Sequence, residues 1–204
     1  RDSVMLVRFI GSLPTSAEAQ AAYAVGYTEL FSLITWTSNG LMGAAAAVAG
    51  QNLGAKQPDR AARAGDAAAK IGLVVAAVIG GAFVLIPGPL LNVFNLNDGV
   101  AGAIARQLLM FLAVSGFFVT VALSFTGALQ GTGDTKSPLF ISMISQLVVP
   151  IAICFAFQAA SGAAGLQSWH IWLAIVCGHA TRATLSVVRF RQGAWKAIAV
   201  NAPA

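Results

Sequence analysis

Charge is scarce in this 204-residue chain, since only 9% of its residues are charged, whereas a soluble domain carries about 25%. Together with a hydrophobic content of 57% and a mean hydropathy of +0.78, this scarcity excludes a disordered chain, a nucleic-acid-binding module and an ordinary cytosolic enzyme. We therefore expect the lipid bilayer, and no nucleic acid, among the partners. The net charge of +5 is typical of basic cytoplasmic loops and needs no acidic partner.

Cysteine is equally scarce, and Cys154 and Cys177 both fall inside apolar runs without a CxxC or Cys/His spacing. Free cysteines in such places behave as small hydrophobes, so we interpret both as packing residues. The sequence also lacks a metal-ligand cluster, a P-loop and a dinucleotide-binding glycine motif. We therefore expect no metal and no cofactor, and this chain does not encode an ATP-driven pump. The chain begins with Arg1 and has no evident cleavable signal, which favours a fragment or a processed chain.

Long apolar runs make up most of the chain, and polar breaks divide them into six segments. The segments cover approximately residues 3–13, 21–50, 67–91, 103–130, 139–159 and 168–190. The first is too short to cross a hydrocarbon core of about 30 Å, so it is interpreted as the end of a truncated helix. The predicted fold class is all-α, a polytopic transmembrane helix bundle of about five full membrane helices plus the truncated first one. Pro150 should kink the fifth segment.

Basic residues predict the orientation of these segments in the membrane. Nine fall on one side of the membrane, namely Arg1, Lys56, Arg60, Arg63, Lys70, Lys136, Arg189, Arg191 and Lys196. Arg8 and Arg106 fall on the other side, and Arg182 lies within the sixth segment. Because cytoplasmic loops are enriched in lysine and arginine, we expect both termini and the loops 51–66 and 131–138 to be cytoplasmic. The expected location is the plasma (inner) membrane.

Polar residues of the second segment share one helical face. The face consists of Glu29, Ser32, Trp36, Asn39, Gly40 and Gly43, at spacings of three and four. Such a face should line a protein interior or a water-filled cavity, where Glu29 could exchange a proton or a cation as its surroundings change. A cationic substrate could stack on Trp36. The alternative is that Glu29 lies at the outer membrane interface and stays hydrated.

The later segments add further polar positions. The fourth carries a stripe of small residues that is typical of close helix packing, namely Gly116, Thr120, Ser124, Gly127 and Gly131. Ser124 and Gln146, which lies one turn before Pro150, are also candidates for the cavity lining. On the sixth segment, His179 could relay protons or be a hydrogen-bonded interior histidine. Arg182, on the same face, could extend its side chain to the cytoplasmic end of the helix.

An enzymatic alternative rests on Ser115 and His179. The tetrad Ala-Val-Ser-Gly at residues 113–116 is faintly similar to that of an intramembrane serine protease, and a Ser–His pair on facing helices could form a nucleophile and its base. However, the tetrad begins with alanine rather than glycine, and serine and glycine are common in membrane helices. The prediction is therefore that the chain is not an enzyme.

Three stretches carry a family resemblance. They are VAGQNLGAKQPDRA at 48–61, ALQGTGDTKSP at 128–138 and VRFRQGAWK at 188–196. In this order and spacing they resemble the multidrug and toxic compound extrusion (MATE) family. The resemblance covers nearly the whole chain, with residues 1–196 as the C-terminal six-helix lobe, its first helix truncated, and 197–204 as a cytoplasmic tail.

These loops have readable physical roles. We expect Gly54 and Gly131 to permit tight turns where helices leave the membrane. Asp134 and Thr135 can cap the following helix, which has Pro138 in its first turn. Arg60 and Arg63, which lie in the first stretch or just after it, can hold their loop on anionic headgroups. The alternative is that each loop sets only the topology.

The resemblance implies two six-helix lobes with a substrate cavity between them. Alternating access would be driven by a proton or sodium gradient, and the substrates would be organic cations or other amphipathic compounds. A glutamate about 25 residues before the LGA glycine is implicated in eukaryotic members, and Glu29 matches that register relative to Gly54. Many members carry an acidic pair on the first and fourth helices of this lobe, but the fourth segment here has no acidic residue and the first helix is truncated, which argues against a sodium site of that kind. Other members place the coupling aspartate in the N-terminal lobe, which would favour protons.

The sequence thus predicts half of a secondary antiporter, whose partners are a small-molecule substrate, a proton or sodium ion and the missing N-terminal lobe. The expected cavity residues are Ser32, Trp36, Asn39, Ser124, Gln146 and His179, with Glu29 as the coupling residue. Two other membrane proteins remain as alternatives. One is a related lipid-linked sugar flippase, which would favour a more cationic cavity, and the other is a structural subunit whose polar stripes serve only packing.

Overall fold

A computed structural model of the chain describes residues 2–161 and 165–197, and all regular elements in these ranges are helices. In chain order they are α1 (Asp2–Gly11), α2 (Ser16–Tyr23), η1 (Ala24–Leu30), α3 (Ser32–Gly54), α4 (Pro58–Leu85), α5 (Pro87–Asn92), α6 (Gly99–Gly131), α7 (Lys136–Met143), η2 (Ile144–Val148), α8 (Val149–Ser161), α9 (Ser168–Arg191) and η4 (Ala194–Ala197). The predicted all-α class is confirmed. Arg1 and residues 198–204 of the predicted tail lie outside the described residues.

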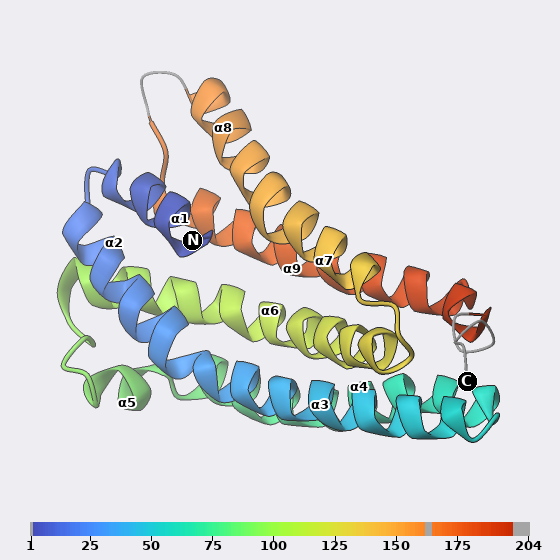
Figure 1. Cartoon of the computed structure of the whole chain (residues 1–204). Coiled ribbons are helices and arrows are strands. Elements are labelled where there is room, and N and C mark those ends of the chain that lie inside the picture. The colour runs from blue at the N-terminus through green and yellow to red at the C-terminus, as the bar shows by residue number, and fades with distance from the viewer. Residues whose placement is uncertain (1, 162–164, 198–204) are drawn as a thin grey trace.

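Helix α6 lies at the centre of the bundle. It packs against α3 and α4 on one side and against α9 on the other (Figure 1). In its most apolar stretch, 67% of the residues are buried. Helices α7 and α8 form an arm that contacts α9 and diverges from α3 and α4 (Figure 1). The bundle therefore has a compact part around α6 and a more loosely packed arm.

Four helical stretches in the described part of the chain are long and apolar enough to cross a membrane. They are α4, α6, the continuous run Lys136–Ser161 and α9. The predicted second segment falls in α2, η1 and α3, with Phe31 in a turn between η1 and α3, and none of these helices is one of the four. The serine, threonine and asparagine residues in the first half of α3 lower its hydropathy.

The connection between α3 and α4 corrects one expectation. The sequence predicts a loop at 51–66, but only residues 55–57 separate the two helices. Pro58 occupies the first turn of α4, where its missing N–H costs nothing. The alanine-rich sequence that follows favours helix, so Arg60 and Arg63 lie on the first turns of α4, whereas Lys56 lies in the short connection.

Small residues allow α6 to approach its neighbours at backbone distance. A Cβ atom added to Gly127 or Gly131 would collide with the backbone carbonyl oxygens of Met42 and Ala46 in α3. On the other side, a Cβ at Gly72 of α4 would collide with the methyl group of Thr120. The packing role predicted for the small-residue stripe of α6 is therefore confirmed.

Two wide helical turns were not predicted. In η1, the backbone N–H of Phe31 donates to the carbonyl of Gly26 at 2.9 Å, a π-type bond that spans one residue more than an α-helical bond. The second, η2, ends just before Pro150. A proline ring clashes with the carbonyl four residues earlier, and a wider turn relieves that clash. The kink predicted at Pro150 therefore takes the form of a π turn.

The two cysteines are free, and Cys154 is fully buried in the hydrophobic core. Cys177 is partly buried. Neither forms a disulfide in the described structure, in agreement with the packing role that the sequence indicates.

Candidate functional site

A cavity of about 680 Å³ lies between α3, α6, the arm formed by α7 and η2, and α9. Its lining mixes apolar, hydroxyl, amide and cationic side chains, namely Tyr27, Phe31, Thr35, Asn39, Met42, Val119, Leu123, Thr126, Gln130, Thr135, Lys136, Pro138, Leu139, Ser142, Gln146, His179 and Arg182. Its volume falls within the range of about 300–1,000 Å³ that is typical of small-molecule pockets. The cavity is the candidate binding site of this chain.

The cavity-facing stripe of the η1–α3 run differs from the predicted one. The structure brings Tyr27, Phe31, Thr35, Asn39 and Met42 to the cavity, a series with spacings of four, four, four and three. The predicted series shares only Asn39 with this stripe. Successive residues of an α-helix are rotated by about 100°, so a shift of one position turns a side chain away from the cavity.

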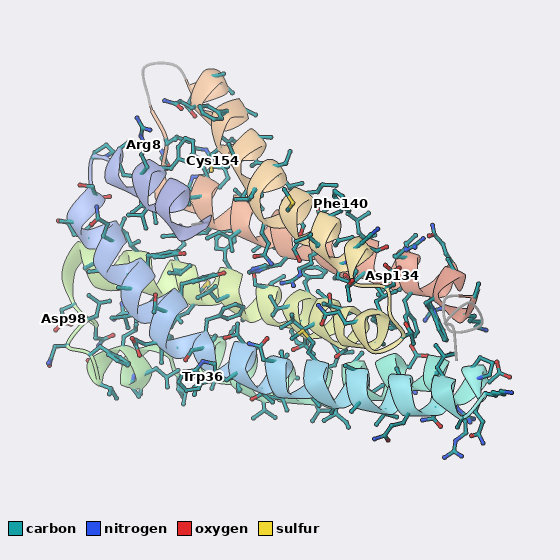
Figure 2. The ribbon with its side chains drawn as sticks, in the orientation of Figure 1. Arg8, Trp36, Asp98, Asp134, Phe140 and Cys154 are labelled. Atoms are coloured by element: carbon teal, nitrogen blue, oxygen red, sulfur yellow. The ribbon has the colours of Figure 1, made fainter. Side chains whose placement is uncertain are left out.

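Three of the predicted cavity residues line the cavity, and three do not. Asn39, Gln146 and His179 line it. The side chain of Trp36 is 72% exposed and lies on the outer face of α3 (Figure 2), and Ser32 donates a hydrogen bond to the backbone oxygen of Glu29. The remaining one, Ser124, is fully buried and donates a 2.9 Å bond to the backbone oxygen of Thr120.

Glu29 is exposed on η1 and is not part of the cavity lining. It lies on the same outer side of the chain as Trp36, Gly40 and Gly43, which are also exposed. A Cβ atom added to Gly40 or Gly43 would find no atom of this chain within 4 Å. Most of the predicted face is therefore an exposed surface of this chain, whereas Asn39 lines the cavity.

At the wall formed by α9, two nitrogen atoms are buried without a hydrogen-bond partner in the described structure. They are Nδ1 of His179 and Nε of Arg182. The imidazole ring stacks between two aromatic rings, with centroid distances of 6.4 Å to Tyr27 and 6.0 Å to Phe31. On the wall formed by α6, Oγ1 of Thr126 is likewise buried and unpartnered. All three atoms belong to residues that line the cavity.

The charged residues of the cavity lining are basic. Arg182 lies beside His179, and Lys136 lies at the start of α7. No aspartate or glutamate of the described residues lines this cavity. The cavity therefore has a positive potential, which favours negatively charged groups.

Several lining residues were missed as cavity residues by the sequence reasoning. On α6, the series Val119, Leu123, Thr126 and Gln130 faces the cavity. Its spacings of four, three and four are visible in the sequence, but the adjacent stripe of glycines was the stronger signal. Nothing in the sequence indicated the π turn η1 that precedes α3.

The protease alternative finds no support in the geometry. Oγ of Ser115 is buried without a hydrogen-bond partner among the described residues, and Nδ1 of His179 is also unpartnered. A nucleophilic serine requires a base within hydrogen-bond reach, so these two residues do not form an activated pair here.

The loop between α6 and α7 is held by a polar cluster, which we call the Asp134 cluster and which consists of Asp134, Ser137 and Arg189. The Asp134 carboxylate accepts bonds from the backbone N–H (3.1 Å) and the hydroxyl (2.8 Å) of Ser137. Nε of Arg189 donates to Oδ2 of Asp134 at 3.0 Å. Asp134 thus caps α7, as predicted, whereas Thr135 makes no side-chain cap. Pro138 lies in the first turn of α7.

Burial alone would raise the pKa of the Asp134 carboxyl. Hydrogen bonds from Ser137 and the neighbouring Arg189 guanidinium outweigh burial, so the pKa lies below its ordinary value. The carboxylate is therefore charged at neutral pH and ties the loop to the end of α9.

The turn residues differ from the expectation. Gly54 and Gly131 are helical, and the left-handed residues of the two loops are Lys56 (φ 59°) and Gly133 (φ 93°). Gly131 is instead required for the close approach to α3. Arg60 lies in the first turn of α4 and donates to Oε1 of Gln57 at 3.0 Å.

These features define an α-helical, multi-pass membrane protein with a cavity of mixed polar and apolar lining between its helices. The MatE family model matches residues 3–156. The chain therefore belongs to the MatE family, whose members are transporters rather than enzymes. It is 30% identical over 180 residues to the probable multidrug resistance protein NorM of Brucella suis. The aligned region is 85% of this chain and 37% of that protein.

Two further comparisons agree. The probable multidrug resistance protein NorM of Xanthomonas campestris is 27% identical over 202 residues, or 98% of this chain and 42% of that protein. A crystal structure of the eukaryotic MATE transporter AtDTX14 matches with a TM-score of 0.80 at 19% identity, and covers 98% of this chain and 43% of that one. The fold is therefore that of part of a MATE transporter. The chain spans less than half the length of these relatives.

Proposed function

We propose that this chain forms the C-terminal lobe of a secondary antiporter that exports organic cations or other amphipathic compounds in exchange for protons or sodium. The observation that carries this proposal is the cavity, which places apolar, hydroxyl and amide groups around a volume suited to a small organic molecule. The relatives named as multidrug resistance proteins and the MATE fold support it.

The outer face of the η1–α3 run is proposed to meet the missing N-terminal lobe. It carries Glu29 and Trp36 next to Gly40 and Gly43, whose open surroundings leave room for a second helix at close distance. In this arrangement Glu29 and Trp36 lie at the boundary between the lobes. There Glu29 carries the proton or cation exchange, and Trp36 provides a stacking surface for the substrate.

Proton exchange is the better supported form of coupling. Sodium, a hard cation, prefers oxygen ligands such as carboxylates, and none of the cavity-lining residues described is acidic. We further propose that the α3–α4 connection, the start of α4 and the end of α9 face the cytoplasm in the plasma (inner) membrane, because basic residues gather there.

The lipid-linked sugar flippase remains a second candidate. The observation in its favour is the basic character of the cavity, which contains Arg182 and Lys136. A flippase would bind a phosphate-bearing lipid and would not export a dye.

The test is ethidium extrusion from cells that express the full-length protein, with and without a protonophore and with sodium present or absent. We expect extrusion that collapses with the proton gradient. Glu29→Gln should reduce the pH dependence of export, whereas Glu18→Gln, a matched change on α2, should not. No extrusion by a protein confirmed in the membrane would contradict the export proposal, and unchanged pH dependence in Glu29→Gln would contradict the coupling role.

A further inference from the structure

The cavity combines a positive charge with polar atoms that lack partners. The buried atoms are Nε of Arg182, Nδ1 of His179 and Oγ1 of Thr126, each on the cavity lining and without a hydrogen-bond partner in the part of the chain described. His179 is only 8% exposed. Buried polar groups are nearly always hydrogen-bonded in folded proteins, and three of the six unpartnered buried side-chain atoms of the described residues belong to the lining of this one cavity.

Nearby carboxylates do not neutralise this charge. Asp134 lies close to the start of α7, but its oxygens are bound by Ser137 and Arg189. Glu29 is exposed and is not part of the lining. A largely buried guanidinium without a counter-ion is costly, and an anionic ligand would remove that cost.

We infer that the cavity binds the anionic group of an amphipathic organic molecule, a carboxylate, sulfonate or phosphate, with Arg182 as its principal partner. This inference names a substrate class for the proposed transporter and rests on the proposed function for its role in export. A guanidinium presents several N–H donors in a planar fork that matches these anions. Thr126 and His179 supply further polar contacts to the ligand.

Part of the cavity lining is apolar and could contact the apolar part of such a ligand. Phe31, Met42 and Leu123 line the cavity beside the polar groups, and Phe31 is fully buried. An apolar body on this wall places an attached anionic group within the same cavity as Arg182. The exposed cation Lys136 at the start of α7 would attract the anion during entry.

A pair of dyes with related ring systems and opposite charge provides the test. Fluorescein is an amphipathic anion and rhodamine 6G an amphipathic cation. The full-length protein, in nanodiscs of zwitterionic phosphatidylcholine, is titrated with each dye and binding is followed by fluorescence polarisation. We expect fluorescein to bind, and Arg182→Gln to weaken it by about tenfold, as expected for loss of a charge-assisted hydrogen bond.

Arg191→Gln is the matched control, because Arg191 lies on the same helix but is 71% exposed in its side chain and pairs with Asp66. It should leave fluorescein binding unchanged, and rhodamine 6G binding should not weaken in either variant. If Arg182→Gln does not fold, Lys136→Gln at the exposed start of α7 should weaken fluorescein binding by about threefold and reduce its salt dependence. Equal fluorescein affinity in wild type and a folded Arg182→Gln variant would overturn the inference, as would preferential binding of rhodamine 6G.

A lipid headgroup and a soluble anion offer the same chemistry. Nanodiscs that also contain phosphatidylglycerol distinguish the two sources. If this lipid displaces fluorescein, the site belongs to a lipid headgroup; if fluorescein binding is undiminished, the site belongs to a soluble compound. Loss of ethidium export with intact, Arg182-dependent fluorescein binding would contradict only the proposed export function. Proton-coupled export with fluorescein binding that is independent of Arg182 would contradict only this inference.

Discussion

Nη2 of Arg189, near the end of α9, lies 2.9 Å from Oδ2 of Asp134, which is only 6% exposed in the loop between α6 and α7. Fifty-five residues separate the two in sequence, so this ion pair fastens the start of the α7–α8 arm to the helix against which the arm packs. Figure 2 shows Asp134 next to α9 at this junction.

Removal of either charge of this pair should destabilise the fold. Asp134→Asn or Arg189→Gln leaves a partly buried charge without its partner, which costs about 1–3 kcal/mol. The measurement is the thermal unfolding midpoint in detergent. Arg191→Gln is the control, because its contact with Asp66 is 3.8 Å long and exposed and should contribute less than about 1 kcal/mol. Equal midpoints for Arg189→Gln and Arg191→Gln would show that the pair contributes nothing.

Acid should weaken the same attachment. The pKa of the Asp134 carboxyl is lowered in the folded protein, because the hydrogen bonds from Ser137 and Arg189 outweigh the effect of burial. The stabilisation is therefore complete above the unfolded pKa of about 4 and is lost as the pH falls through the lower folded pKa. Unfolding midpoints measured from neutral pH down to acid should fall more steeply in wild type than in Asp134→Asn. If the midpoints of wild type and Asp134→Asn fell in parallel with pH, the Asp134 carboxyl would not be the source of the acid-dependent loss of stability.

The glycines of α6 should tolerate no side chain. Gly127→Ala places a Cβ against the carbonyl of Met42, and overpacking of this kind costs about 1–3 kcal/mol. Gly81→Ala in α4 is the control, because an added Cβ there meets no atom within 4 Å and alanine favours helix by about 1 kcal/mol. Unfolding midpoints should fall for the first variant and rise or stay constant for the second. A stable Gly127→Ala protein would refute the backbone contact.

Ser38 and Thr120 share a buried hydrogen bond of 2.8 Å between α3 and α6. Ser38→Ala or Thr120→Val alone leaves one hydroxyl without this partner, at a cost of about 1–3 kcal/mol. The double variant should cost less than the sum of the two single variants, since neither hydroxyl remains to be satisfied. A double-mutant cycle on unfolding free energies measures this coupling. Strict additivity would mean that the bond contributes no energy.

Gly178 of α9 faces the wide turn before Pro150. A Cβ at Gly178 would lie 2.6 Å from the carbonyl oxygen of Ser145 and 2.9 Å from Cγ of Pro150. We expect Gly178→Ala to push the arm away from α9, which should lower stability and increase hydrogen exchange in residues 144–150, because their backbone bonds lose the cover of α9. Exchange rates of this segment equal to those of wild type would contradict the contact.

Sequence reasoning predicted the all-α class and the helix boundaries of α6 and α9 closely, because long apolar runs between polar breaks are strong signals. It placed the stripe on the η1–α3 run one position away from the cavity. The reason is that it looked for the most polar face, and Glu29 and Trp36 lie on the exposed side. A single chain contains no information on which polar face meets its own cavity and which meets another surface.

The stretch 58–66 shows a second limit. Basic residues there indicated a loop, but local helix propensity and Pro58 at the first turn extended α4 through it. Likewise, the role of Gly131 in close packing depends on the carbonyl of Ala46, which lies far away in the sequence. The stripe of small residues predicts that Gly131 packs closely, but the atom it packs against is set by tertiary structure.

The backbone contacts between α3 and α6 have a mechanical consequence. At Gly127 and Gly131 there is no room for a Cβ beside the carbonyl oxygens of α3, so no side chain there can change rotamer to let the helices slide, and we expect α3 and α6 to move as one unit. The α7–α8 arm carries one wall of the cavity and meets α9 at a π turn that interrupts the regular helix. We therefore expect any change in the aperture of the cavity to come from movement of the α7–α8 arm rather than from sliding of α3 against α6.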